Sequence, residues 1–111
     1  MDVLVIVPVG MADPSLPAGA MLVTYSNVVD AVVALKGGDA PAVLVSDGIG
    51  EDGAEAVAAA IRDRGAPCIE VRSERWDGST ISPVSAACRG VVSGFGVGGV
   101  AAAVRAVSDE A

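Results

Sequence analysis

The chain contains no histidine in its 111 residues. Ser-His-Asp and Cys-His nucleophile systems use an imidazole as their base, so both are excluded. Zinc sites with histidine ligands are excluded for the same reason. We expect neither a bound metal nor a cofactor.

Aromatic residues are scarce, with one Trp, one Tyr and one Phe, although 52% of the residues are hydrophobic. The core must therefore be built from Val, Ala, Leu and Ile. Such a core is typical of a buried parallel sheet covered by alanine-rich helices. The length suits one domain spanning residues 1–111, which can bury a core without disulfides or metals.

Basic residues are few, and the formal net charge is −7. A surface of this sign repels nucleic-acid phosphates and anionic membranes, so we expect neither as a partner. The chain has no apolar run of membrane-spanning length and no signal-peptide pattern, which predicts a cytoplasmic protein. Cys68 and Cys88 lie in apolar contexts and are predicted to be buried free thiols in a reducing compartment.

Short apolar runs alternate with helical patterns along the chain, which predicts parallel strands joined by right-handed crossovers. Residues 9–20 hold two prolines and two glycines, so a loop is expected where the first helix would stand. The predicted fold is therefore α/β and flavodoxin-like, with three layers, about five parallel strands and a missing or shortened first helix. The predicted strands are 3–7, 21–25, 42–45, 67–71 and 90–93, and the predicted helices are 28–35, 52–64, 82–88 and 98–107.

From residue 21 onward, the order of elements resembles a receiver domain of two-component signalling. Residues 42–47 are similar to the third receiver strand, which ends in the phosphate-accepting aspartate, here Asp47. Residues 67–73 are similar to the fourth strand, with Ser73 at its terminal Ser/Thr position. The resemblance implies a receiver-like sheet with Asp47 at its carboxyl edge.

Two receiver features are missing from the sequence. An acidic pair should follow the first strand to hold Mg²⁺, but residues 7–10 contain no carboxylate. A lysine should follow the fifth strand, where Ser93, Gly94 and Phe95 stand instead. The resemblance therefore implies a pseudo-receiver with a vestigial Asp47, acting as a non-enzymatic regulatory or protein-interaction module that needs no phosphorylation.

A second resemblance is local and covers residues 83–96. The pattern of Pro83, Ala86, Gly90, Gly94 and Gly96 is similar to a stretch of the crotonase (enoyl-CoA hydratase) family. In that family, a glycine near the position of Gly94 donates a backbone N–H to an oxyanion hole for an acyl-CoA thioester. As an alternative, the resemblance implies a truncated crotonase-like protein that binds acyl-CoA or serves as a subunit.

Glycine-rich turns provide a third interpretation. Gly48, Gly50 and Gly53 follow a predicted strand and open a predicted helix, which is the setting of a dinucleotide fingerprint. Their N–H groups, with Ser73, are candidates for holding a small anion, as are those of Gly94 and Gly96. A small nucleotide- or phosphate-binding protein is thus an alternative, while flexible turns and close helix packing explain the same glycines structurally.

One sheet face is expected to be poorly covered because the first helix is missing. That face would carry only the last helix and the segment containing Met11, Leu16 and Met21. Trp76 follows an arginine in a polar segment, a combination typical of interface hot spots, with local packing as the alternative. We expect a homodimer or a protein partner to cover these residues.

Overall fold

The computed structural model describes residues 3–10, 19–38, 40–46, 49–64, 66–72, 83–93 and 98–110. Five parallel strands form one sheet in the order β2-β1-β3-β4-β5. This is the predicted flavodoxin-like order, which reverses direction between β1 and β3. The described elements are β1 (Val3–Pro8), β2 (Ala20–Tyr25), α1 (Val28–Lys36), β3 (Ala42–Val45), α2 (Glu51–Arg64), β4 (Cys68–Arg72), α3 (Pro83–Ala87), β5 (Gly90–Ser93) and α4 (Gly98–Glu110). They agree with the predicted elements to within three residues at each end.

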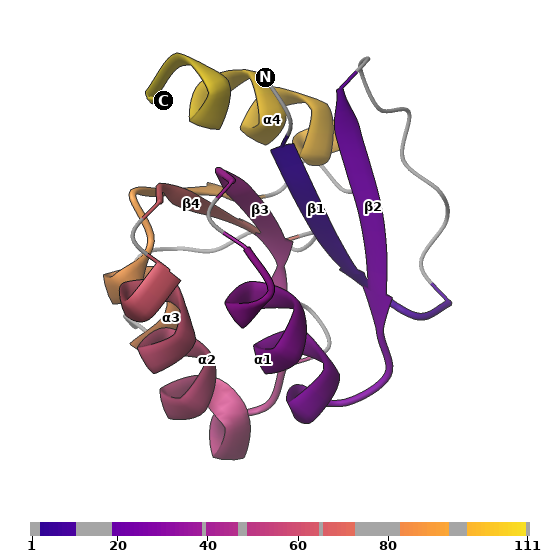
Figure 1. Cartoon of the computed structure of the whole chain (residues 1–111), viewed down its shortest axis with the longest axis vertical. Coiled ribbons are helices and arrows are strands. Elements are labelled where there is room, and N and C mark those ends of the chain that lie inside the picture. The colour runs from indigo at the N-terminus through magenta and orange to yellow at the C-terminus, as the bar shows by residue number, and fades with distance from the viewer. Residues whose placement is uncertain are drawn as a thin grey trace.

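Helices cover both faces of the sheet (Figure 1): α1, α2 and α3 lie on one face and α4 on the other. The crossovers through α1, α2 and α3 all advance in the same direction across the sheet, so right-handedness places these helices on one side. The predicted three-layer architecture is confirmed. Residues 11–18, part of the predicted loop, lie outside the described residues.

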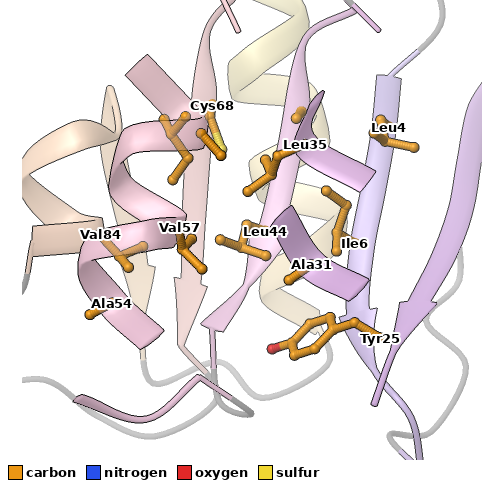
Figure 2. Close-up of a cluster of buried hydrophobic side chains, with 13 residues drawn as sticks. Leu4, Ile6, Tyr25, Ala31, Leu35, Leu44, Ala54, Val57, Cys68 and Val84 are labelled. Carbon is orange, nitrogen blue, oxygen red and sulfur yellow. The ribbon is translucent and has the colours of Figure 1, made fainter. Parts of the chain in front are cut away.

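The core has two layers because alternate residues of a strand face opposite sides of the sheet. Leu4, Ile6 and Leu44 pack against α1 and α2, and Figure 2 shows this cluster closing around Leu35 and Val57. The other layer packs against α4 and consists almost entirely of valines from β1, β3 and β4. Burial on both faces explains why these strands are continuous apolar runs.

The start of α1 is fixed by its capping residues. Asn27 Oδ1 accepts a hydrogen bond from the Asp30 N–H at 2.9 Å, and Asp30 Oδ2 accepts one from the Ser26 hydroxyl at 2.9 Å. The first of these bonds satisfies an N–H that the first helical turn leaves without an intrahelical partner, and the second ties the preceding Ser26 to the helix. The helix ends at Lys36, and the N–H of the following Gly37 donates to the Ala34 carbonyl. The predicted helix is confirmed.

Arg64 joins the end of α2 to the end of α1. Its side chain is 7% exposed, Nε donates to the Ala40 carbonyl at 2.9 Å, and Nη1 donates to the Leu35 carbonyl. The Leu35 carbonyl belongs to the last turn of α1, where intrahelical donors run out. A guanidinium with several donors is suited to satisfying such carbonyls while buried.

Candidate functional site

A polar cluster lies at the carboxyl ends of β3 and β4. Glu70 faces the same side of the sheet as Leu44, its register partner, and it is 1% exposed. Its Oε2 accepts a hydrogen bond from the Ser46 hydroxyl at 2.5 Å and another from Arg72 Nε at 3.1 Å. Burying a carboxylate is costly unless it is both paired and hydrogen-bonded, and this one is both. We call Ser46, Glu70 and Arg72 the carboxyl-end cluster.

The carboxyl-end cluster has part of the geometry of an activated nucleophile, because a serine hydroxyl lies within hydrogen-bond reach of a buried carboxylate. Acyl transfer also requires N–H donors aimed at the developing oxyanion. Two nearby backbone N–H groups are occupied, since Ile49 donates to the Ser46 carbonyl at 2.9 Å and Gly53 donates to the Gly50 carbonyl at 3.1 Å. Through the bonds of Glu70 to Ser46 and Arg72, the cluster links the end of β3 to β4.

Gly53, one of the predicted anion-binding residues, lies inside α2 and faces α1. A Cβ at this position would lie 2.9 Å from Val28 Cγ1, 3.0 Å from Val28 Cβ and closer still to Val28 Cγ2. Close helix packing therefore accounts for this glycine, and its N–H already has a partner. Gly50 is exposed, and a Cβ there would meet nothing within 4 Å.

Several predicted residues lie outside the described part of the chain, so their roles stay predictions. In the polar and glycine-rich turns these are Asp47, Gly48, Ser73, Gly94 and Gly96. Among the interaction candidates they are Met11, Leu16 and Trp76.

Met21 is the predicted interaction residue that the structure describes. It lies in β2, is 50% exposed, and faces the α1 side because its register partner is Leu4. It therefore does not lie on the face covered by α4, where the missing helix was expected to leave a gap. The adjacent Leu22 faces that side, beside Val5, and is 39% exposed.

Large exposed hydrophobic residues are concentrated in one part of the sequence. Within the described residues they are Val9, Met21, Leu22, Val29 and Val33, and none lies beyond residue 33. Val29 and Val33 are one turn apart on α1, so they share a helix face.

The two cysteines lie together on the α2 and α3 side of the sheet. Cys68 is buried, as predicted, but Cys88 is only half-buried because it follows α3 near the surface. Both are free thiols, and their Sγ atoms are 3.9 Å apart. A hydrogen bond to Cys68, burial, and the neighbouring Cys68 and Glu70 all raise the pKa of Cys88.

Comparisons with known proteins add no family assignment. A scan against models of protein families found no match for this chain, and a search of curated proteins found none that matches. Among the described residues, no group of three or more cysteine, aspartate or glutamate side chains could hold a metal ion. The described helices include none that is both long enough and apolar enough to cross a bilayer.

Proposed function

We propose that the chain is a non-enzymatic regulatory or interaction module with a receiver-like fold, working without phosphorylation and binding a protein surface through β2 and α1. The observation that carries the proposal is the placement of exposed apolar side chains. Among the described residues, the exposed large hydrophobic side chains all fall between residues 9 and 33, in or beside these two elements and the end of β1.

The edge position of β2 supports this proposal. In the described sheet β2 pairs with β1 alone, so no described strand occupies its outer edge, where another strand could add. Its sequence, Ala-Met-Leu-Val-Thr-Tyr, contains no charge, proline or glycine. Soluble proteins usually protect an edge strand with such residues, so an unprotected one suits strand addition.

A second copy of the chain is the first partner to consider. Two β2 strands related by a two-fold axis can pair antiparallel, giving an interface in which each copy contributes the same residues. The strand itself carries no charge, so the negative net charge of the chain does not act directly at the contact. Val29 and Val33, at 69% and 64% exposed, add apolar surface on the next element.

The positions of the carboxylates support the proposal that phosphorylation is not required. Residues 7–10, at the end of β1, contain none, whereas a receiver needs acidic residues at this position to bind Mg²⁺. Glu70 is a carboxylate near the carboxyl ends of the strands, but it is buried and bonded to Ser46 and Arg72. Adding beryllofluoride with Mg²⁺ should therefore cause no shifts in an amide NMR spectrum. Saturable shifts around residues 46–53 would contradict a phosphorylation-independent module.

The interaction is tested by measuring molar mass with light scattering as the protein concentration rises through the micromolar range. We expect the wild-type chain to approach the mass of a dimer. Leu22→Lys and Val29→Lys should keep it monomeric, because each buries a charge at the contact. Ala59→Lys is the matched control, since Ala59 is exposed on α2 and the charge added is the same. A wild-type monomer at all concentrations, or equal effects of all three variants, would refute the proposed contact surface.

A further inference from the structure

The backbone itself holds Cys68 and Cys88 next to each other. The Arg89 N–H donates to the Cys68 carbonyl at 2.8 Å, and the next pair along the strands, Ile69 and Gly90, is in register. Cys88 immediately precedes Arg89, so strand pairing places its side chain against the start of β4. Strand pairing therefore keeps the two cysteine backbones adjacent, and the Sγ atoms lie 3.9 Å apart.

The two thiols differ in accessibility. Cys68 is 2% exposed, whereas Cys88 is half-buried. A small reagent thus reaches Cys88 first, and Cys68 is the nearest group that can respond. Only two sulfur ligands are present here, and no third cysteine or carboxylate completes a metal site among the described residues. Because zinc requires four ligands, thiol chemistry is better suited to this pair than zinc binding.

We propose that Cys68 and Cys88 form a dithiol site that reacts with small-molecule disulfides of the glutathione class and closes to an intramolecular disulfide. The Cys88 thiolate attacks one sulfur of the small disulfide, forming a mixed disulfide and releasing one glutathione thiolate, which takes up a proton. The Cys68 thiolate then attacks Cys88 Sγ and releases the second glutathione. Two protein thiols are oxidised, and one small disulfide is reduced to two thiols.

The geometry allows this closure. A disulfide has an S–S length of about 2 Å, so the sulfurs must approach by about 1.9 Å. Rotation about the two Cα–Cβ bonds moves each sulfur by distances of this size. The new bond would tie the end of α3 to the start of β4 and close the loop of residues 68–88. Constraining that loop in the unfolded chain raises stability, so oxidation should raise the melting temperature by several degrees.

Peptide mass mapping of the folded wild-type protein after incubation with oxidised glutathione tests the proposal. We expect a Cys68–Cys88 disulfide with the loss of two hydrogen atoms. The mixed disulfide should stay about tenfold less abundant, because the neighbouring thiol competes at a far higher effective concentration than free glutathione. A lasting glutathione adduct on the wild-type chain, a disulfide between chains, or two thiols that remain fully alkylatable would overturn the proposal.

Two single variants separate the roles of the thiols. Cys68→Ala should keep a persistent glutathione adduct on Cys88, whereas Cys88→Ala should gain little adduct because Cys68 is buried. The reaction of the wild-type chain should also accelerate about tenfold for each rise of one pH unit above neutrality, since the raised pKa of Cys88 limits the thiolate. A rate independent of pH would contradict attack by Cys88. If either variant does not fold, the wild-type mass map and pH profile still decide.

Discussion

Replacing Gly53 by alanine tests how closely α1 and α2 pack. Alanine is the better helix former by about 1 kcal/mol, so propensity alone predicts a more stable protein. The added methyl, however, would lie 2.9 Å from Val28 Cγ1 and 3.0 Å from Val28 Cβ. The Val28 Cβ is attached directly to the backbone, so rotating the side chain cannot move it away. The helices must separate instead.

Overpacking of this kind costs about 1–3 kcal/mol, which exceeds the gain in helix propensity. We therefore expect Gly53→Ala to lower the free energy of unfolding by about 1 kcal/mol, or the melting temperature by about 4 °C. Urea unfolding followed by far-ultraviolet circular dichroism measures this, with an unchanged denaturant slope. Gly50→Ala is the matched control: a Cβ there has open space, so its effect should stay within about 0.5 kcal/mol.

A double-mutant cycle identifies the cause. Val28→Ala removes both methyl groups that the new Cβ would meet, so Gly53→Ala should cost less in that background, with a coupling of about 1 kcal/mol. If the two substitutions are additive, or if Gly53→Ala stabilises the wild-type chain, close approach to Val28 is not the reason for glycine here.

Two further substitutions test single hydrogen bonds in the fold. Tyr25→Phe removes the buried 2.6 Å bond from the Tyr25 hydroxyl to the Val45 carbonyl and should destabilise by about 1–2 kcal/mol in urea unfolding; an unchanged midpoint would mean that water or another donor replaces it. Asn27→Ala removes the side-chain acceptor for the Asp30 N–H and should cost about 1 kcal/mol, whereas Asn27→Ser should restore most of it. Equal stability of the alanine and serine variants would show that the cap contributes little.

The sequence predicted the fold well because its local signals agree with one another. The apolar runs of β1, β3 and β4 are buried on both faces, and the strand order agrees with right-handed crossovers between the strands. The Asn27 cap and the Gly37 cap bound α1 close to the predicted ends of the helix. Apolar runs and helix caps are formed by residues that are close together in the sequence, so they can be predicted from the sequence directly.

The contacts within the site were harder to predict because they join residues distant in sequence. Ser46 and Glu70 are 24 residues apart, and Cys68 and Cys88 are 20 apart. One signal was available for Glu70: it is the acidic residue inside the apolar run Cys68–Val71, so burial with a partner could be expected. The role of Gly53 depends on the position of α1, which no glycine pattern specifies.

The region where strand order reverses is occupied by the protein's own side chain. In open parallel sheets, ligands bind outside the carboxyl ends of the strands at this reversal, here between β1 and β3. Tyr25, the last residue of β2, passes the end of β1 and bonds to the carbonyl of Val45 at the end of β3, as its position in Figure 2 illustrates. Its side chain is 2% exposed. A ligand at the reversal would have to displace a buried, hydrogen-bonded ring. By contrast, no described strand pairs with the outer edge of β2, so among the described residues strand addition there breaks no backbone pairing.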